Sequence, residues 1–136
     1  MVIDGQTCEK MFESVLQKRG HKIEKSSRQE DMYKHFDFII DDKIKVDVKS
    51  EKKLNRWDEN SSSIFWIEAL NVRGNTGWLF GEADYIAFFH NYEFLMVELK
   101  DLQKLVLKIN PDYLKPSASK AYKKWYRRKD RLDSVM

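Results

Sequence analysis

The 136-residue chain has few of the residues that cross-link a protein or interrupt its secondary structure: one cysteine, two prolines and five glycines. With Cys8 alone, no intramolecular disulfide can form, and its place in an apolar helical stripe predicts a buried free thiol in a reducing compartment. No apolar run approaches the roughly 18 residues of a membrane span, and the N-terminus carries an acid at Asp4. We therefore expect a cytoplasmic protein with neither a signal peptide nor a membrane partner.

Two motifs that the sequence lacks argue against particular ligands. His21, His35 and His90 have no metal-ligand spacing, and no cysteine cluster accompanies them, so zinc is not expected. The glycine-containing stretch 71–81 lacks a phosphate-loop signature, so nucleoside triphosphate binding is not indicated either. We expect no small-molecule cofactor.

The length of the chain and the distribution of its charge limit how many domains it can form and which partners it can bind. A chain of 136 residues suffices for one domain and is too short for two comfortable ones. The formal net charge is only +3, but the basic residues are unevenly placed, which matters more for a polyanionic partner than the total does. We expect a core formed by residues 1–110 and, in the same domain, a basic helical extension over residues 111–136.

The most informative segment, residues 36–49, predicts a β-hairpin. Apolar and polar residues alternate over 44–49, which puts Asp47 and Lys49 on one face of a strand, about 7 Å apart at roughly 3.3 Å per residue. A preceding run of β-branched and aromatic residues pairs with this strand across a polar turn. Asp37 is thereby brought beside Asp47.

These three residues suit cleavage of a phosphodiester. Two carboxylates provide the hard oxygen ligands that Mg²⁺ prefers, and a bound metal activates water and acts as a Lewis acid. Lys49 could then orient or deprotonate that water, or offset charge in the transition state. The alternative is an ordinary solvated hairpin face, because alternating Asp, Lys and Val is also how any half-exposed strand reads.

An amphipathic helix is predicted in front of the hairpin, between an N-cap at Asp4 and a C-terminal stop at Gly20. Its apolar residues recur at helical spacing: Cys8, Met11, Phe12, Val15 and Leu16. Glu9 falls roughly 80° from the centre of this stripe and Glu13 roughly 120°. Glu9 is therefore expected to reach toward the sheet and Glu13 to face water, although Glu9 could equally be a boundary residue paired with a surface lysine.

In this order the helix with Glu9, the strand with Phe36-Asp37 and the strand Val46-Asp47-Val48-Lys49-Ser50 resemble the PD-(D/E)xK nuclease superfamily. Within it they are most similar to archaeal-type Holliday-junction resolvases and phage nucleases, over roughly residues 5 to 100. Two departures are visible, since Phe36 stands at the proline of the motif and Asp47 is the less frequent of the two permitted acids.

The resemblance implies an α/β, restriction-endonuclease-like core in which an N-terminal helix packs on a mixed central β-sheet, with further helices toward the C-terminus. It implies Mg²⁺-dependent cleavage of DNA, in which Mn²⁺ can substitute, and a two-fold homodimer. Carried across, Asp37, Asp47 and Glu9 would be the metal-binding acids and Lys49 the catalytic lysine.

Candidate nucleic-acid contacts lie outside the hairpin. Strand 64–70 carries Glu68, either a further carboxylate of the site or a partner of Arg73. A second hairpin, 83–99, and a helix continuing to Ile109 are predicted to follow. A helix over 117–136 would present its cations to a phosphate backbone or only to solvent. The candidate nucleic-acid-binding residues are Lys52, Lys53, Arg56, Arg73, Lys123, Lys124, Arg127 and Arg128.

The sequence thus predicts a Mg²⁺-dependent endodeoxyribonuclease, resolvase-like in its structure specificity. Two alternatives stay open: a catalytically inactive nucleic-acid-binding module of the same fold, and a structural subunit whose basic surface binds a protein or a membrane. The acids gathered at Asp37 and Asp47 favour the enzyme, because a binding module has no reason to place carboxylates where phosphates approach.

Overall fold

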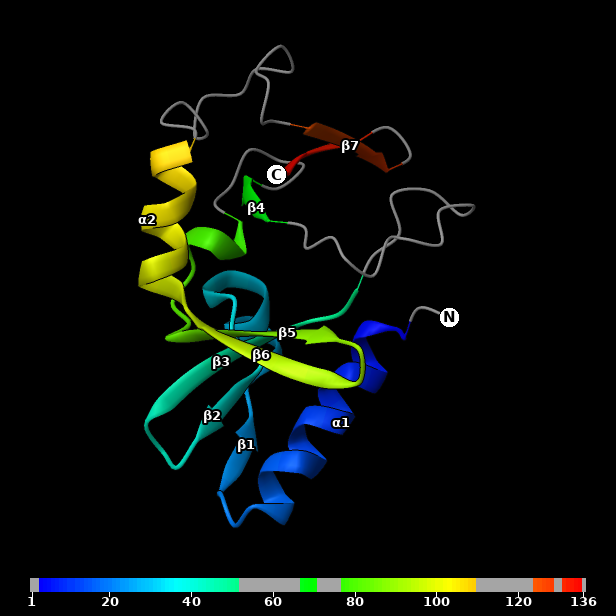
Figure 1. Cartoon of the computed structure of the whole chain (residues 1–136), viewed down its shortest axis with the longest axis vertical. Coiled ribbons are helices and arrows are strands. Elements are labelled where there is room, and N and C mark those ends of the chain that lie inside the picture. Colours follow the sequence, from blue (N-terminus) through cyan, green and yellow to red (C-terminus); the bar gives the residue numbers. More distant parts are fainter. Residues whose placement is uncertain (1–2, 52–66, 71–76, 110–123, 129–130, 136) are drawn as a thin grey trace.

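The computed structural model describes residues 3–51, 67–70, 77–109, 124–128 and 131–135 (Figure 1). The elements follow one another along the chain as α1 (Gly5–Lys18), β1 (Ile23–Lys25), the π-helix η1 (Glu30–Lys34), β2 (Phe38–Ile40), β3 (Ile44–Lys49), β4 (Glu68–Leu70), the 3₁₀-helix η3 (Trp78–Phe80), β5 (Tyr85–His90), β6 (Glu93–Glu98), α2 (Leu99–Ile109), β7 (Lys124–Arg128) and β8 (Arg131–Val135).

Helix α1 begins and ends where the sequence predicts. The Asp4 side chain accepts a 2.7 Å hydrogen bond from the backbone N–H of Thr7, which is the action of an N-cap. At the other end Gly20 has a φ of +85°, a left-handed conformation that glycine adopts without steric cost. The stripe between them buries Cys8 and Phe12. No helix within the described ranges is long and apolar enough to cross a membrane.

The predicted hairpin is confirmed as β2 paired antiparallel with β3, with Phe38 opposite Val46. Asp41 and Asp42 form its turn with φ of +52° and +60°. Two successive left-handed residues match the right-handed twist of the strands they join, and aspartate tolerates that conformation better than most residues. The alternation of side chains along the strands and the conformation of the turn therefore both favour this hairpin.

The strands of the larger sheet lie in the order β1-β2-β3-β5-β6. Strand β3 pairs parallel with β5, and the other neighbours pair antiparallel. The sheet is thus mixed, and together with α1 and α2 it makes an α/β fold, as predicted. The second hairpin and the helix after it are also confirmed, as β5–β6 and α2.

Each face of this sheet is covered by a different helix (Figure 1). On one face, α1 packs through Cys8 and Phe12 against Val46 and Val48. On the other, α2 and η3 pack through a cluster of Phe36, Trp78, Leu79, Ala83, Ile86, Phe88, Leu99, Leu102 and Val106. Side chains that alternate with Val46 and Val48 on β3 therefore point to the face that α2 and η3 cover.

The helix expected over 117–136 is wrong in the part that the structure describes. Lys124–Arg128 and Arg131–Val135 form an antiparallel hairpin, β7–β8, and β8 also pairs with β4 (Glu68–Leu70) in a three-stranded sheet. The aromatic pair at 125–126 favours a strand as readily as a helix, and pairing with β4 decides in favour of the strand. Strand β4, predicted from residues 64–70, therefore belongs to this smaller sheet.

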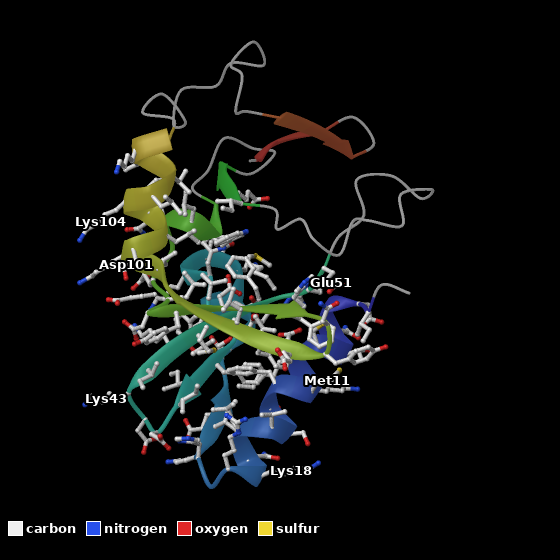
Figure 2. The ribbon with its side chains drawn as sticks, viewed as in Figure 1. Met11, Lys18, Lys43, Glu51, Asp101 and Lys104 are labelled. Carbon is white, nitrogen blue, oxygen red and sulfur yellow. The ribbon has the colours of Figure 1, made fainter. Side chains whose placement is uncertain are left out.

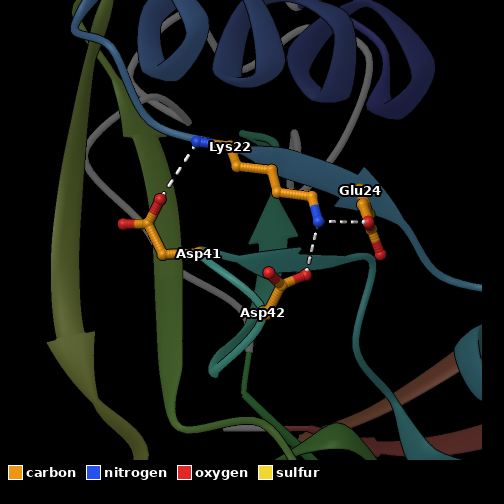
Figure 3. A network of polar contacts seen from close by, with 4 residues as sticks. All are labelled: Lys22, Glu24, Asp41 and Asp42. Atoms are coloured by element: carbon orange, nitrogen blue, oxygen red, sulfur yellow. Dashed lines mark hydrogen bonds and ion pairs between the residues drawn. The ribbon is translucent and has the colours of Figure 1, made fainter.

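Ion pairs fasten the edge strand β1 to the turn between β2 and β3 (Figure 3). Lys22 Nζ lies 2.8 Å from Asp42 Oδ1 and 3.2 Å from Glu24 Oε1. The backbone N–H of Lys22 donates to Asp41 Oδ1 at 3.0 Å. The side chains are more than half exposed in the two ion pairs, so these contacts add little stability and serve to hold the edge in register.

Candidate active site

Asp37 is fixed immediately before β2 by the backbone of β3. Its N–H donates to the Val46 carbonyl at 2.9 Å, and its Oδ2 accepts a 2.7 Å hydrogen bond from the Val48 N–H. The side chain is only 6% exposed. Because a carboxylate so anchored cannot rotate away without giving up a buried hydrogen bond, the hairpin itself sets its direction.

Asp47 and Lys49 project from β3 on the face opposite α1. Lys49 Nζ lies 3.1 Å from Asp47 Oδ2 and 5.3 Å from the centroid of the Trp78 ring, which belongs to the cluster under α2. Asp47 is 2% exposed, whereas the Lys49 side chain keeps 28% of its surface. The carboxylate is therefore buried, and the lysine side chain beside it is partly exposed.

Asp37 is difficult to ionise beside Asp47. Burial, followed by repulsion from Asp47, raises the pKa of Asp37 to about 10, although the Val48 N–H opposes the change. Without a cation Asp37 therefore holds a proton at neutral pH. Burial by itself would lower the pKa of Lys49, but attraction to Asp47 and Asp37 outweighs it and raises that pKa, so the amine stays charged.

One oxygen of this site is buried without a hydrogen bond from any described residue. Asp47 Oδ2 accepts none within that part of the chain, since Lys49 is at ion-pair distance without hydrogen-bond alignment. The Lys49 amine offsets part of the cost of burying this oxygen, which has no aligned donor among the described residues. A cation bound at this carboxylate would supply the partner that the oxygen lacks.

The fit to Mg²⁺ rests on the pair of aspartates. Among the described residues no group of three or more His, Cys, Asp or Glu side chains is arranged to hold a metal ion. Mg²⁺ nevertheless uses one or two carboxylates and fills its other positions with water and substrate phosphate. Asp37 and Asp47 meet that requirement, and both lie beside an amine.

Glu9 is not brought into this group. It is half-buried on α1, which covers the sheet face opposite the one that carries Asp47 and Lys49. Glu13 is also half-buried, and its Oε1 accepts a 3.4 Å hydrogen bond from Gln17 Nε2 on the same helix. A catalytic role for Glu9 stays a prediction.

Most of the predicted nucleic-acid contacts lie outside the described residues: Lys52, Lys53, Arg56, Arg73 and Lys123. Lys124, Arg127 and Arg128 belong to β7, in a hairpin instead of the expected helix. Their roles in binding stay predictions.

Two further acids act on the site, and the sequence proposes only one of them, Glu68, as one of two alternatives. Glu68 on β4 contributes to the raised pKa of Lys49, and the Asp31 side chain, on the π-helix η1, contributes to that of Asp37. Glu51, two residues beyond Lys49, is only 8% exposed and lies near the start of α1 (Figure 2). Glu51 lies beyond the end of β3, so the alternation that places Asp47 and Lys49 does not reach it, and Asp31 gives no signal in the sequence.

Comparison of the chain with protein-family models, with curated proteins and with solved structures gave no match.

Proposed function

We propose that this protein is a Mg²⁺-dependent endodeoxyribonuclease with a restriction-endonuclease-like core and a site of the PD-(D/E)xK type. One observation carries the proposal: two buried aspartates, Asp37 and Asp47, lie together beside the amine of Lys49, and one carboxylate oxygen accepts no hydrogen bond among the described residues.

A purely structural role explains this arrangement poorly. Burying one ionised carboxylate already costs several kcal/mol unless it is paired, and a second one close enough to share a hydrogen bond adds repulsion. Without a cation, a proton on Asp37 and the charge of Lys49 compensate the pair at neutral pH. A divalent cation would take the place of that proton, which is the reason to interpret the two carboxylates as ligands.

The chain's own residues can then be given roles. Asp37 and Asp47 would hold the cation, which supplies Lewis acidity at a phosphoryl oxygen and activates water when it is bound. Lys49, charged and partly exposed, would orient the attacking water or offset the charge that builds on the phosphoryl oxygens. The Val48 N–H would keep Asp37 in place while substrate enters.

DNA as the substrate, structure-specific cleavage like that of Holliday-junction resolvases, and a two-fold dimer are supported by the resemblance of the motif. The uneven distribution of 25 basic residues supports a polyanionic substrate in general.

The test is incubation of pure protein with labelled four-way junction, flap, duplex and single-stranded DNA, and with single-stranded RNA, each with Mg²⁺, Mn²⁺ or a chelator. We expect cleavage of at least one DNA substrate with either metal and none with chelator. Tight binding without cleavage in every condition would instead favour the inactive nucleic-acid-binding module.

A further inference from the structure

Strand β6 leaves a row of apolar side chains exposed at one edge of the larger sheet. It is the last strand in the sheet order, so no strand in the described part of the chain pairs with its outer side. Leu95 is 54% exposed and Met96 43%, and Tyr92, in the turn before the strand, is exposed as well. From Phe94 to Val97 the strand carries no charge. An apolar edge of this kind pairs with another strand unless the protein protects it.

The opposite edge of the same sheet has such protection. Strand β1 is only three residues long, and two of them, Glu24 and Lys25, are charged. Lys22 adds ion pairs with Glu24 and Asp42 at that edge. Short, charged strands are a common means by which soluble proteins prevent pairing between edges. Strand β6 has twice the length and an apolar centre, which indicates an edge that binds a partner.

The β5–β6 hairpin fixes which backbone groups of β6 face outward. Residues 91–92 form its two-residue turn, with φ of +50° and +61°, and His90 lies opposite Glu93. The two residues that flank such a turn exchange both of their ladder hydrogen bonds, and bonded and non-bonded pairs alternate from there along the strands. The residues whose N–H and C=O groups point away from β5 are therefore Phe94, Met96 and Glu98.

One face of β6 borders a groove. The groove has a volume of about 340 Å³ and lies between α1 and the β5–β6 hairpin, where Arg19, Tyr92 and Phe94 are among the residues that line it. Phe94 also packs against the cluster under α1. Because side chains alternate along a strand, Met96 and Glu98 lie on this same face of the sheet.

We propose that a second copy of this chain pairs antiparallel with β6 across a two-fold axis at Leu95, so that two five-stranded sheets join edge to edge. A two-fold axis perpendicular to the sheet keeps each face on its own side, and opposite residues of an antiparallel pair share a face. Glu93 and Glu98 lie on different faces, so symmetric pairing never sets these two carboxylates opposite each other. An axis at Met96 would instead place Phe94 opposite Glu98.

The proposed register matches the residues of the two copies. Phe94 of each copy lies opposite Met96 of the other, where the sulfur and the ring attract each other and the outward backbone groups form the ladder hydrogen bonds. Glu98 of each copy lies opposite Tyr92 of the other, on the face where Arg19 lines the groove. An acid of one copy is thus brought to a cation of the other. This complementarity assigns the edge to a second copy.

The pairing also sets the distance between the two aspartate sites. In each copy β5 and β6 lie between β3 and the axis, so the two β3 strands are five strand spacings apart, roughly 24 Å at about 4.8 Å each. Since the axis keeps each face on its own side, Asp47 and Lys49 of both copies lie on one face. The dimer therefore presents two sites to one substrate, and only this consequence rests on the proposed function.

The test is the oligomeric state, measured by sedimentation equilibrium over a series of protein concentrations. The wild-type protein should dimerise. Leu95→Glu and Leu95→Lys should each raise the dissociation constant at least roughly 100-fold, because like charges would then face each other on the axis. An equimolar mixture of the two variants should dimerise again, since opposite charges face each other in the mixed dimer. Leu105→Glu, at a leucine of α2 that is 53% exposed, is the matched control and should keep the dimer.

A cross-link tests the register directly. Leu95 is at a non-hydrogen-bonded position on the axis, where opposite Cα atoms are about 4.5 Å apart, a distance that a disulfide spans. Leu95→Cys should therefore form a disulfide between copies under mild oxidation, visible as a dimer on a non-reducing gel, whereas Leu105→Cys should not. The native Cys8 is buried.

Four outcomes would overturn the proposed interface. They are a wild-type protein that is monomeric at every concentration, a dimer that withstands both charged variants, a mixture of those variants that stays monomeric, and a Leu105→Glu variant that dissociates equally. The two proposals fail separately. A dimer with the expected cross-link that cleaves nothing disproves the nuclease alone, whereas metal-dependent cleavage by a monomer disproves the β6 interface alone.

Discussion

The backbone N–H of Val48 donates a 2.7 Å hydrogen bond to Asp37 Oδ2, and this bond ties the acid before β2 to the strand that carries Asp47 and Lys49. Val48 itself packs against α1 on the opposite face of the sheet. One residue thus anchors the hydrophobic core with its side chain and orients a candidate ligand with its amide. The candidate site is therefore as rigid as the central strand.

The first prediction concerns the three central residues. Asp37→Asn and Asp47→Asn should each reduce metal-dependent cleavage at least roughly 100-fold, because each removes one of two carboxylate ligands. Lys49→Met should reduce it by about 10² to 10⁴, the range for removal of a group that assists proton transfer. Single-turnover cleavage at saturating Mg²⁺ measures the effect. Asp42→Asn, in the exposed turn of the same hairpin, is the control and should cleave normally; unchanged activity in Asp47→Asn would refute the mechanism.

The second prediction is a pH dependence of stability in the absence of metal. The pKa of Asp37 rises from its ordinary 3.8 to about 10 on folding, so between these values the folded protein holds a proton that the unfolded chain has released. The contribution of this group to stability is therefore present in full below about pH 4 and is lost as the pH rises toward 10. The free energy of unfolding should fall by at most about 1.4 kcal/mol per pH unit across that window.

Urea unfolding at several pH values between 5 and 9, with chelator, measures this slope. Asp37→Asn is neutral in both states and should remove the slope, while Asp42→Asn should keep it. Added Mg²⁺ should stabilise the wild-type protein more at high pH, because the cation competes with the proton on Asp37. Parallel profiles for Asp37→Asn and the wild type would show that Asp37 holds no extra proton.

The third prediction concerns the helix-borne acid. Glu9→Gln should impair cleavage more than Glu13→Gln does, because Glu9 lies near the buried Cys8, whereas Glu13 is one turn further along and bonds to Gln17. Metal titration of cleavage by the two variants compares them directly. Equal, near-normal activity would mean that the site uses no acid from α1, and the reverse order would mean that Glu13 is that acid.

The fourth prediction concerns the basic residues of the C-terminal segment. Neutralising Lys123, Lys124, Arg127 and Arg128 together should weaken binding to every DNA sequence alike, because interactions with phosphates carry no base information. The slope of log affinity against log salt concentration should shrink by roughly 0.9 for each duplex phosphate that is no longer neutralised. Anisotropy titrations between about 50 and 300 mM salt measure both effects. A variant with wild-type affinity and slope would assign binding to other cations.

The sequence by itself determined the elements that are governed by local rules. Asp4 and Gly20 mark the two ends of an amphipathic helix. Alternation of apolar and polar side chains on either side of an Asp-Asp turn defines β2–β3. Both signals act over a few residues, where side-chain period and turn conformation decide the outcome. For the same reason the sequence could place Asp47 and Lys49 on one face and Asp37 beside them.

Only the tertiary structure decided what depends on pairing between distant segments. The aromatic segment at 124–128 has a local pattern compatible with a helix, and pairing of β8 with β4 makes its hairpin part of a sheet. Likewise the parallel pairing of β3 with β5 brings Glu51 to His90 across 39 positions, and the packing of Cys8 and Phe12 on Val46 and Val48 puts α1 on the face opposite Asp47. No periodicity encodes such pairings, since their energy comes from burial and hydrogen bonds that form only after the chain has folded.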